Sequence, residues 1–318
     1  MRVPSCCFEK VMQRSGGILT FESKPNIIIT ENKAFLKFRF GQEVIGMKWE
    51  CICGKTGYFD TFLAILPTYH ISEREILLFD SGVRPDPELL EELERMGVRV
   101  RAVLCTHLHP DHIANNAVLV EKHGAEIFST QPERESHESW EKLSYPITFL
   151  DGESSVVIDG VEIAILPTPG HSPGQLAYVT PDGVCCVGDA LMTAPAVRKS
   201  KLPYMEDVDR AIVSMEVIRN TDYPFYAVAH KGVVTREEMP ALVDENIQKE
   251  LDLYDLLRQQ ITGPKSRKEV LSDFMLSAGI QEKSLETFFI RYTAKIRLDA
   301  LIDAGEYYLR DGMVIPCH

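Results

Sequence analysis

The chain has 318 residues and carries 34 Lys and Arg against 47 Asp and Glu, a formal net charge of −13. A charge of this sign argues against a protein built to wrap the phosphates of a nucleic acid or to dock on an anionic membrane. The apolar share of 45% is enough for a sizeable core. No apolar run reaches the roughly 18 residues that a membrane-spanning helix needs.

The N-terminal residues and the cysteines indicate a cytoplasmic protein. The first seven residues lack the apolar stretch of a signal peptide. Eight Cys in 318 residues is far below the density of a disulfide scaffold. Cys105, Cys185 and Cys186 lie in apolar, strand-like segments, where a free thiol packs as a small hydrophobic group. We therefore expect a reducing, cytoplasmic compartment.

Strand-like and helix-like segments alternate along much of the chain. Residues 1–45 contain two strand-like segments, predicted to form an extra hairpin or to contact a second copy. Apolar strands follow at residues 62–66 and 75–79, and a helix then runs from its N-cap Asp86 to Gly97. A further strand (98–105), a helix (113–123) and a strand (125–128) continue the pattern. This alternation is typical of an α/β fold. Residues 131–145 are predicted to form a surface helix, in which His137 lacks other metal-binding residues nearby.

Residues 106–112 read T-H-L-H-P-D-H and follow an apolar strand. Residues two apart in an extended backbone point the same way, so His107 and His109 can face one metal ion. Pro110 disfavours a continuing strand or helix, which places the motif on a loop at a strand end. Asp111 and His112, beyond this bend, can face a second ion about 3.5 Å away. A polar loop without a metal is the alternative, but three His and one Asp within six residues favour the metal site.

Three more candidate ligands follow apolar strands in the same manner. His171 lies in a Pro- and Gly-rich loop at residues 167–174, Asp189 follows the strand at 184–187, and His230 follows the strand at 227–229. Each of these features is weak alone, because a Gly-Asp after a strand is usually a turn. Their order after the first motif is the informative feature.

An H-x-H-x-D-H motif followed by His, Asp and His resembles the metallo-β-lactamase superfamily, over roughly residues 45–235. The resemblance implies a four-layer αβ/βα sandwich with a two-metal site at one edge of two facing sheets. Position by position, it assigns His107, His109 and His171 to the first metal, Asp111, His112 and His230 to the second, and Asp189 to a bridging position. It also implies that Asp80 supports a metal-binding His from behind.

The implied chemistry is hydrolysis. Two divalent metal ions, zinc first and iron or manganese as alternatives, would share a bridging hydroxide that attacks a carbonyl or phosphoryl group. Asp111 would orient the nucleophile or take its proton. The resemblance favours the glyoxalase II-like branch of the superfamily, which implies cleavage of a thioester, ester or lactone of a small, anionic molecule.

Four residues between Asp189 and His230 are candidate contacts for such a substrate. Arg198, Lys199 and Lys201 form a basic cluster just before Tyr204. A charge cluster is normally a solvated face, so the alternative is that these side chains simply face water.

The C-terminal region has a different pattern. It contains a helix at residues 237–260, a capping box from Ser266 to Glu269 opening a second helix, a third helix closed by Gly305, and a hairpin with an Asp311-Gly312 turn. This order resembles a winged helix. We therefore predict three parts: an N-terminal extension (1–45), the catalytic domain (46–236) and a small winged-helix-like domain (237–318).

Other functions remain open at this point. A winged helix suggests a single-strand endoribonuclease or phosphodiesterase, but residues 241–318 hold ten Lys and Arg against thirteen Asp and Glu, which makes no basic face. A structural or lid role is therefore favoured for this region. A mononuclear iron persulfide dioxygenase and a non-enzymatic binding protein are further alternatives, and a homo-oligomer is left open.

Overall fold

The computed structural model of the chain describes residues 47–61, 63–280 and 286–317. The hairpin predicted for residues 1–45 lies outside the described residues. Within the described part, no helix is both long and apolar enough to cross a membrane.

The first sheet has seven strands in chain order. They are β1 (Trp49–Cys53), β2 (Thr56–Asp60), β3 (Ile65–His70), β4 (Glu75–Phe79), β5 (Arg99–Leu104), β6 (Glu126–Ser129) and β7 (Thr148–Phe149). The first four strands form an antiparallel meander, and β4 to β7 run parallel. Parallel neighbours need a crossover, and helices α1 (Pro87–Met96) and α3 (Asn116–His123) supply the first two.

The second sheet has six strands in the order β13-β12-β11-β10-β9-β8. Their bounds are β8 (Ser155–Ile158), β9 (Val161–Pro167), β10 (Leu176–Val179), β11 (Val184–Gly188), β12 (Phe225–Val228) and β13 (Gly232–Thr235). Among its described strands, β11 and β12 run parallel and the other neighbouring pairs are antiparallel. The connection between them contains helices α5 (Ala194–Lys199) and α6 (Val208–Arg219).

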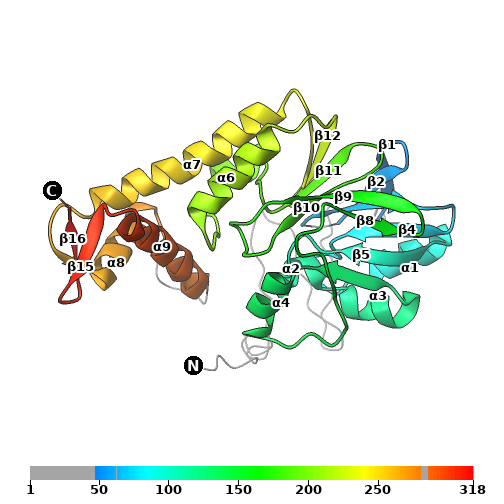
Figure 1. Cartoon of the computed structure of the whole chain (residues 1–318), viewed down its shortest axis with the longest axis horizontal. Helices are drawn as coiled ribbons and strands as arrows, with labels where there is room; N and C mark the ends of the chain where they lie inside the picture. Colours follow the sequence, from blue (N-terminus) through cyan, green and yellow to red (C-terminus); the bar gives the residue numbers. More distant parts are fainter. Residues whose placement is uncertain (1–46, 62, 281–285, 318) are drawn as a thin grey trace, which may run out of the picture.

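The two sheets face each other, and helices cover both outer faces (Figure 1). Successive strand residues point to opposite faces of a sheet. Leu77 accordingly packs between the sheets while Leu78 packs under α1. Cys186 packs between the sheets, and Cys185 faces the layer that contains α6. The predicted four-layer sandwich is therefore confirmed, since both faces of each central strand are buried.

Local capping signals place the helix ends where the sequence predicts them. The Asp86 carboxylate accepts a hydrogen bond from the Glu88 amide at the start of α1, and Gly97 ends it with φ of 67°. Helix α8 (Arg267–Ser277) begins with the full capping box of Ser266 and Glu269. These signals depend on residues within one turn, so they can be read without the fold.

The helix predicted for residues 113–123 is interrupted. The chain forms a short helix α2 (Pro110–Ile113), in which Pro110 occupies the first turn, and then α3. Asn115 lies between the two helices, and its side-chain amide donates to the Ser81 carbonyl at 2.6 Å and to the Arg84 carbonyl at 3.0 Å. The contacts of Asn115 with the loop after β4 favour the break, and the second half of the histidine motif is helical rather than a loop.

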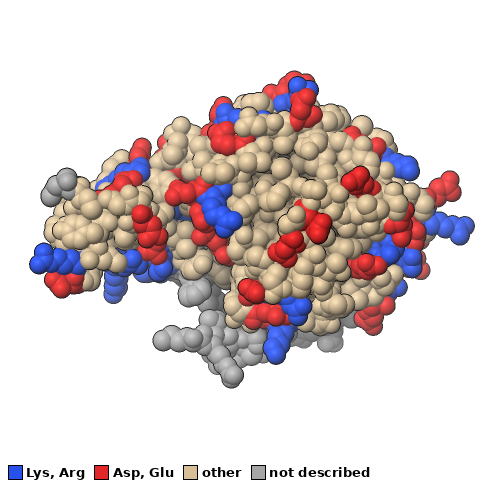
Figure 2. Space-filling model, viewed as in Figure 1, with Lys and Arg blue, Asp and Glu red and all other residues tan. Residues whose placement is uncertain are grey.

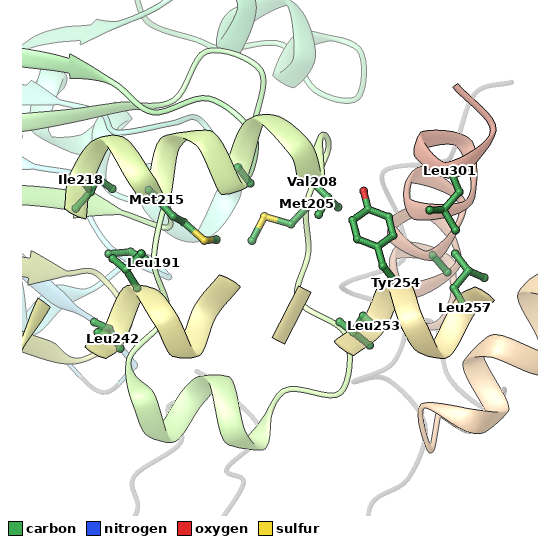
Figure 3. Packing of buried hydrophobic residues seen from close by; sticks show 14 of the residues in the cluster. Leu191, Met205, Val208, Met215, Ile218, Leu242, Leu253, Tyr254, Leu257 and Leu301 are labelled. Carbon is green, nitrogen blue, oxygen red and sulfur yellow. The ribbon is translucent and has the colours of Figure 1, made fainter. Parts of the chain in front are cut away.

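The C-terminal region follows the predicted order of elements. It contains α7 (Met239–Gln259), β14 (Lys265–Ser266), α8, α9 (Glu286–Asp303), β15 (Tyr307–Arg310) and β16 (Met313–Pro316). The three short strands form one sheet in the order β14-β16-β15. Figure 3 shows that Met215 and Ile218 of α6, Leu242 and Leu257 of α7, and Leu301 of α9 belong to one packed cluster. Helix α7 thus joins the C-terminal elements to the outer layer of the sandwich.

Candidate metal centre

The predicted ligands all follow strand ends at one edge of the sandwich. Strands β4 and β5 are parallel, as are β11 and β12, so their carboxyl ends meet at shared edges of the two sheets. Backbone hydrogen bonds join the two sheets at this edge, from Leu176 N to Thr106 O at 2.9 Å and from Ile65 N to Ala229 O at 2.8 Å. The ligand loops of one sheet are thereby held against those of the other.

All seven predicted metal-binding side chains come together there. They form three overlapping groups, each with its ligand atoms within 4.8 Å of one another: His107, His109 and His171; His107, His112 and Asp189; and Asp111, His112 and His230. The first and third groups are the two metal triads predicted from the sequence. Asp189 lies between them, with one carboxylate oxygen 3.6 Å from His171 Nε2 and 3.2 Å from His230 Nε2.

Several buried ligand atoms have no hydrogen-bond partner among the described residues. These atoms are Nε2 of His107, Nε2 of His112 and Oδ1 of Asp189. Buried polar atoms are normally hydrogen-bonded, because leaving one unpaired costs about 1–3 kcal/mol. Three such atoms in one cluster of imidazoles and carboxylates fit the requirements of divalent metal ions.

The electrostatics of the cluster favour the metal-binding protonation states of His107, His109 and Asp189, but not that of His112. Burial and the neighbouring imidazoles lower the pKa of His107 and His109 well below the ordinary value, so both side chains are neutral near pH 7. Burial disfavours the charged form of Asp189, but His112 and His230 outweigh it and hold the pKa of this carboxyl well below its usual range. Burial also opposes a charge on His112, whose pKa is nevertheless raised by Asp189 and Asp80. Metal binding would therefore displace a proton from His112.

Asp80 lies directly behind His112. Its Oδ2 accepts hydrogen bonds from His112 Nδ1 and from the Thr106 hydroxyl, both at 2.8 Å, and its Oδ1 accepts from the Thr106 amide at 2.7 Å. Such an arrangement directs Nε2 of the imidazole toward the cluster. Asp80 has φ of 64°, a left-handed conformation that Asp and Asn tolerate better than most residues.

Sequence reasoning missed two residues that hold the ligand loops. Helix α4 (Gln131–Glu138) is shorter than the predicted surface helix, and its inner face is buried. Glu133 accepts from the Leu108 amide at 2.9 Å and from the Gly174 amide at 2.8 Å, which ties two ligand loops together. His137 Nδ1 donates to the Leu108 carbonyl at 2.7 Å. The only sequence signal was their spacing of four, which places both on one helix face.

The predicted substrate residues lie in different surroundings. The Tyr204 ring centroid is 5.2 Å from that of His109, and the Tyr204 carbonyl accepts a hydrogen bond from His171 Nδ1 at 3.0 Å. Arg198 instead pairs with Glu245 of α7 at 2.6 Å. Lys201 donates to the Gly279 carbonyl, and Lys199 is exposed. Arg198 thus contacts α7, and Lys201 contacts the residue that follows the C-cap of α8, so their described partners are not the histidines.

A buried arginine of α9 holds the loop that carries Tyr204. Arg297 is completely buried; it donates to the Pro203 carbonyl at 3.1 Å and pairs with the equally buried Glu250 of α7 at 2.5 Å. The Thr293 hydroxyl also donates to the Pro203 carbonyl, and it accepts from the Met205 amide at 3.1 Å. The C-terminal region therefore fixes the backbone on both sides of Tyr204.

A family-level comparison agrees with this geometry. The family model described as the metallo-beta-lactamase superfamily matches residues 68–230, which is just over half of the chain and includes every predicted metal ligand. The chain belongs to the metallo-beta-lactamase superfamily. The superfamily predicted from the histidine motif is thus confirmed.

The curated relatives of this superfamily member described here are hydroxyacylglutathione hydrolases. Their similarity to this chain confirms the predicted likeness to the glyoxalase II branch. The protein of that name from Albidiferax ferrireducens is 31% identical over 127 residues, which are 38% of this chain and 46% of the relative. The one from Dechloromonas aromatica is 33% identical over 106 residues, 33% of this chain and 37% of the relative. The chain therefore spans less than half of the length of these relatives.

Solved structures share the fold of the superfamily member over most of the described chain. A metallo-beta-lactamase family protein from Thermus thermophilus superposes with a TM-score of 0.63 at 18% identity, covering 86% of this chain and 99% of the other. A beta-lactamase domain protein from Burkholderia ambifaria gives 0.60 at 17% identity, with 85% and 93% covered. At this identity the likeness concerns the fold alone.

Proposed function

We propose that this protein is a metal-dependent hydrolase that cleaves a thioester, ester or lactone of a small molecule. The observation that carries the proposal is the convergence of seven imidazole and carboxylate ligands from both sheets on one edge, with Asp189 between two triads. The hydroxyacylglutathione hydrolases among its relatives support a thioester as the substrate class.

Two divalent cations, zinc foremost, would be held by the two triads and Asp189. When bound, such ions polarise a carbonyl oxygen and make a bound water acidic at neutral pH. His107 and His109 supply neutral nitrogen ligands, and Asp189 supplies a charged oxygen between the two sides. The donor set suits zinc, iron or manganese.

Asp111 is the ligand best suited to move a proton. Its side chain is 43% exposed, against 14% for Asp189, and its Oδ2 lies 3.6 Å from His230 Nε2. One oxygen can therefore face an attacking water while the other faces the metal-binding cluster. A carboxylate in this position can orient the water and accept its proton.

A small-molecule substrate fits the charge better than a nucleic acid does. Residues 241–318 carry three more acidic than basic residues, and on the face shown in Figure 2 acidic and basic side chains are interspersed without a continuous basic tract. A nucleic-acid-binding surface needs clustered Lys and Arg to neutralise phosphates. This favours hydrolysis of a metabolite over the endoribonuclease alternative.

The test is hydrolysis of a panel of thioesters, esters and lactones by the zinc-loaded protein. We expect turnover in at least one class, and we expect Asp111→Asn to lower kcat by about 100-fold or more, the usual contribution of a general base. Asp222→Asn, which removes an exposed carboxylate paired with Arg236, is the matched control and should keep full activity. If the metal-loaded protein cleaves none of the three substrate classes, the proposal is refuted.

A further inference from the structure

Aromatic side chains from three separate segments gather beside the proposed metal ligand His109. The ring of His109 lies 5.2 Å from Tyr204 and 6.3 Å from Trp140, measured between centroids. Tyr204 stacks on Tyr292 at 6.2 Å, and Trp140 contacts Phe289 at 6.2 Å. Phe289 and Tyr292 are three residues apart on α9 and so lie on one face of that helix. We call Trp140, Tyr204, Phe289 and Tyr292 the aromatic collar.

Three collar residues expose much of their apolar surface. Trp140 is 46% exposed, Phe289 48% and Tyr292 39%. Single exposed aromatic residues need no explanation, but a group of them beside convergent polar residues is typical of a ligand-binding site. Burying these rings against a ligand would be favourable, because large aromatic side chains contribute much of the contact area in binding sites.

Neighbouring residues fix the positions of two collar rings, Trp140 and Tyr204. Trp140 stacks on His137 at 6.2 Å with planes 24° apart, and His137 is itself anchored to the Leu108 carbonyl. The Tyr204 hydroxyl donates to Glu206 at 3.2 Å, and its backbone is fixed by α9 as described above. A surface positioned in this way loses little conformational entropy when a ligand binds.

We propose that the collar binds a flat apolar group of the substrate, an aryl ring or an equivalent unsaturated group, next to the scissile bond. The inference rests on the proposed hydrolase function and narrows its substrate class. The collar side chains carry no positive charge. Arg198 and Lys201, which precede Tyr204 in the chain, contact Glu245 and Gly279 instead. The collar therefore suits an apolar group better than a carboxylate-rich one.

The test compares phenylacetyl and acetyl thioesters of one thiol, N-acetylcysteamine, and also the benzyl and methyl thioesters of acetic acid. These two pairs place the aryl ring on either side of the scissile bond. We expect Trp140→Ala and Phe289→Ala to lower kcat/KM for the aryl member of at least one pair by about tenfold, and to change the other member by about twofold or less. Tyr308→Ala, at a ring on β15 that is 43% exposed, is the matched control. Equal effects on both members of both pairs, or no effect, would overturn the proposal.

A binding measurement separates failure of the collar from failure of the hydrolase proposal. Phenacyl and acetonyl thioethers of the same thiol have no bond that the enzyme can hydrolyse, and their affinities can be measured by titration calorimetry. We expect the wild type to bind the phenacyl compound at least about tenfold more tightly, and Trp140→Ala to remove this preference. Equal affinities in the wild type would contradict the collar even if hydrolysis occurs. A preserved preference without any hydrolysis would contradict only the proposed function.

Discussion

Asp80 is the residue that we propose supports the metal ligand His112 without binding a metal itself. Its left-handed φ of 64° suits Asn as well as Asp, so Asp80→Asn removes the charge without straining the backbone. The Asn side chain has only one acceptor oxygen, and its NH2 group only donates. It therefore cannot accept from the Thr106 amide at one position while also accepting from His112 and the Thr106 hydroxyl at the other. We expect metal affinity to fall by about 10- to 100-fold, as for other partners of metal-binding histidines.

The affinity can be measured by competition with a chromogenic chelator. Asp311→Asn is the matched control, because Asp311 also has a positive φ of 51° but lies in the exposed β15–β16 turn. Equal metal affinity in Asp80→Asn and the wild type would show that Asp80 does not support the centre.

Glu133 provides a prediction about pH. Burial raises the pKa of this carboxyl above its ordinary value, although the Ser172 side chain and two backbone amides oppose the shift. The folded protein then binds the proton more tightly than the unfolded chain. The stability from this group is complete below the ordinary pKa of about 4.5 and is lost as pH rises through the folded-state pKa.

The Glu133→Gln variant has no carboxyl to titrate at this position. As the pH rises above about 4.5, the Tm of the wild type should therefore fall relative to that of the variant. The measurement is thermal unfolding at a series of pH values, with Glu135→Gln on the exposed face of α4 as control. A difference in Tm that stays constant with pH would contradict the raised pKa.

Residues differ in how far the sequence alone reveals them. The residues of the cluster could be proposed as metal ligands because one short motif supplies four of them, and the order of the other three after apolar strands matches the family resemblance. Glu133 could not be predicted, since the amides it accepts from belong to Leu108 and Gly174, which lie 25 and 41 residues away. Only the packing of α4 against both loops reveals its role.

At the scale of elements, α9 supports the loop around Tyr204 through Arg297. Arg297→Met would leave Glu250 buried without its partner, which typically costs about 3–5 kcal/mol. Replacing both residues, Arg297→Met with Glu250→Leu, removes the uncompensated charge and should recover much of that stability. The Pro203 carbonyl still loses its Arg297 donor, so the double variant should remain impaired in kcat/KM.

Chemical denaturation and thioester kinetics on the two variants together test this role. If the double variant recovers both stability and activity, then Arg297 serves the core alone and does not position the Tyr204 loop. A control substitution, Arg267→Met, removes an α8 side chain that pairs with Asp299 of α9 at 2.8 Å and should leave activity unchanged.

Elements were predictable where their signals are local. The N-cap of α1 and the capping box of α8 involve residues two or three apart, and both are present as predicted. The break between α2 and α3 was missed because Asn115 bonds to Ser81, which is 34 residues earlier in the chain. The winged-helix likeness of the C-terminal region remains a prediction, although its helices and hairpin occur in the expected order.

At the scale of the whole molecule, the proposed metal ligands come together because two sheets close on each other at one edge. Gly188, at the end of β11, has φ of 54°. A Cβ there would lie 2.5 Å from the hydroxyl oxygen of Thr106, in the loop that follows β5 of the other sheet. The lack of a side chain lets the Asp189 loop approach His107. The alternation of strands and helices predicted an α/β fold, and the family resemblance implied the four layers. Neither predicted this close approach, which depends on the packed three-dimensional arrangement.

The most direct test of the paired centre is the metal content per chain, measured by elemental analysis after reconstitution and removal of free metal. We predict two equivalents in the wild type and about one in His230→Ala, which removes a ligand of one triad only. His70→Ala, outside these triads, should retain two. A wild-type protein that binds one equivalent or none would contradict the two-metal site.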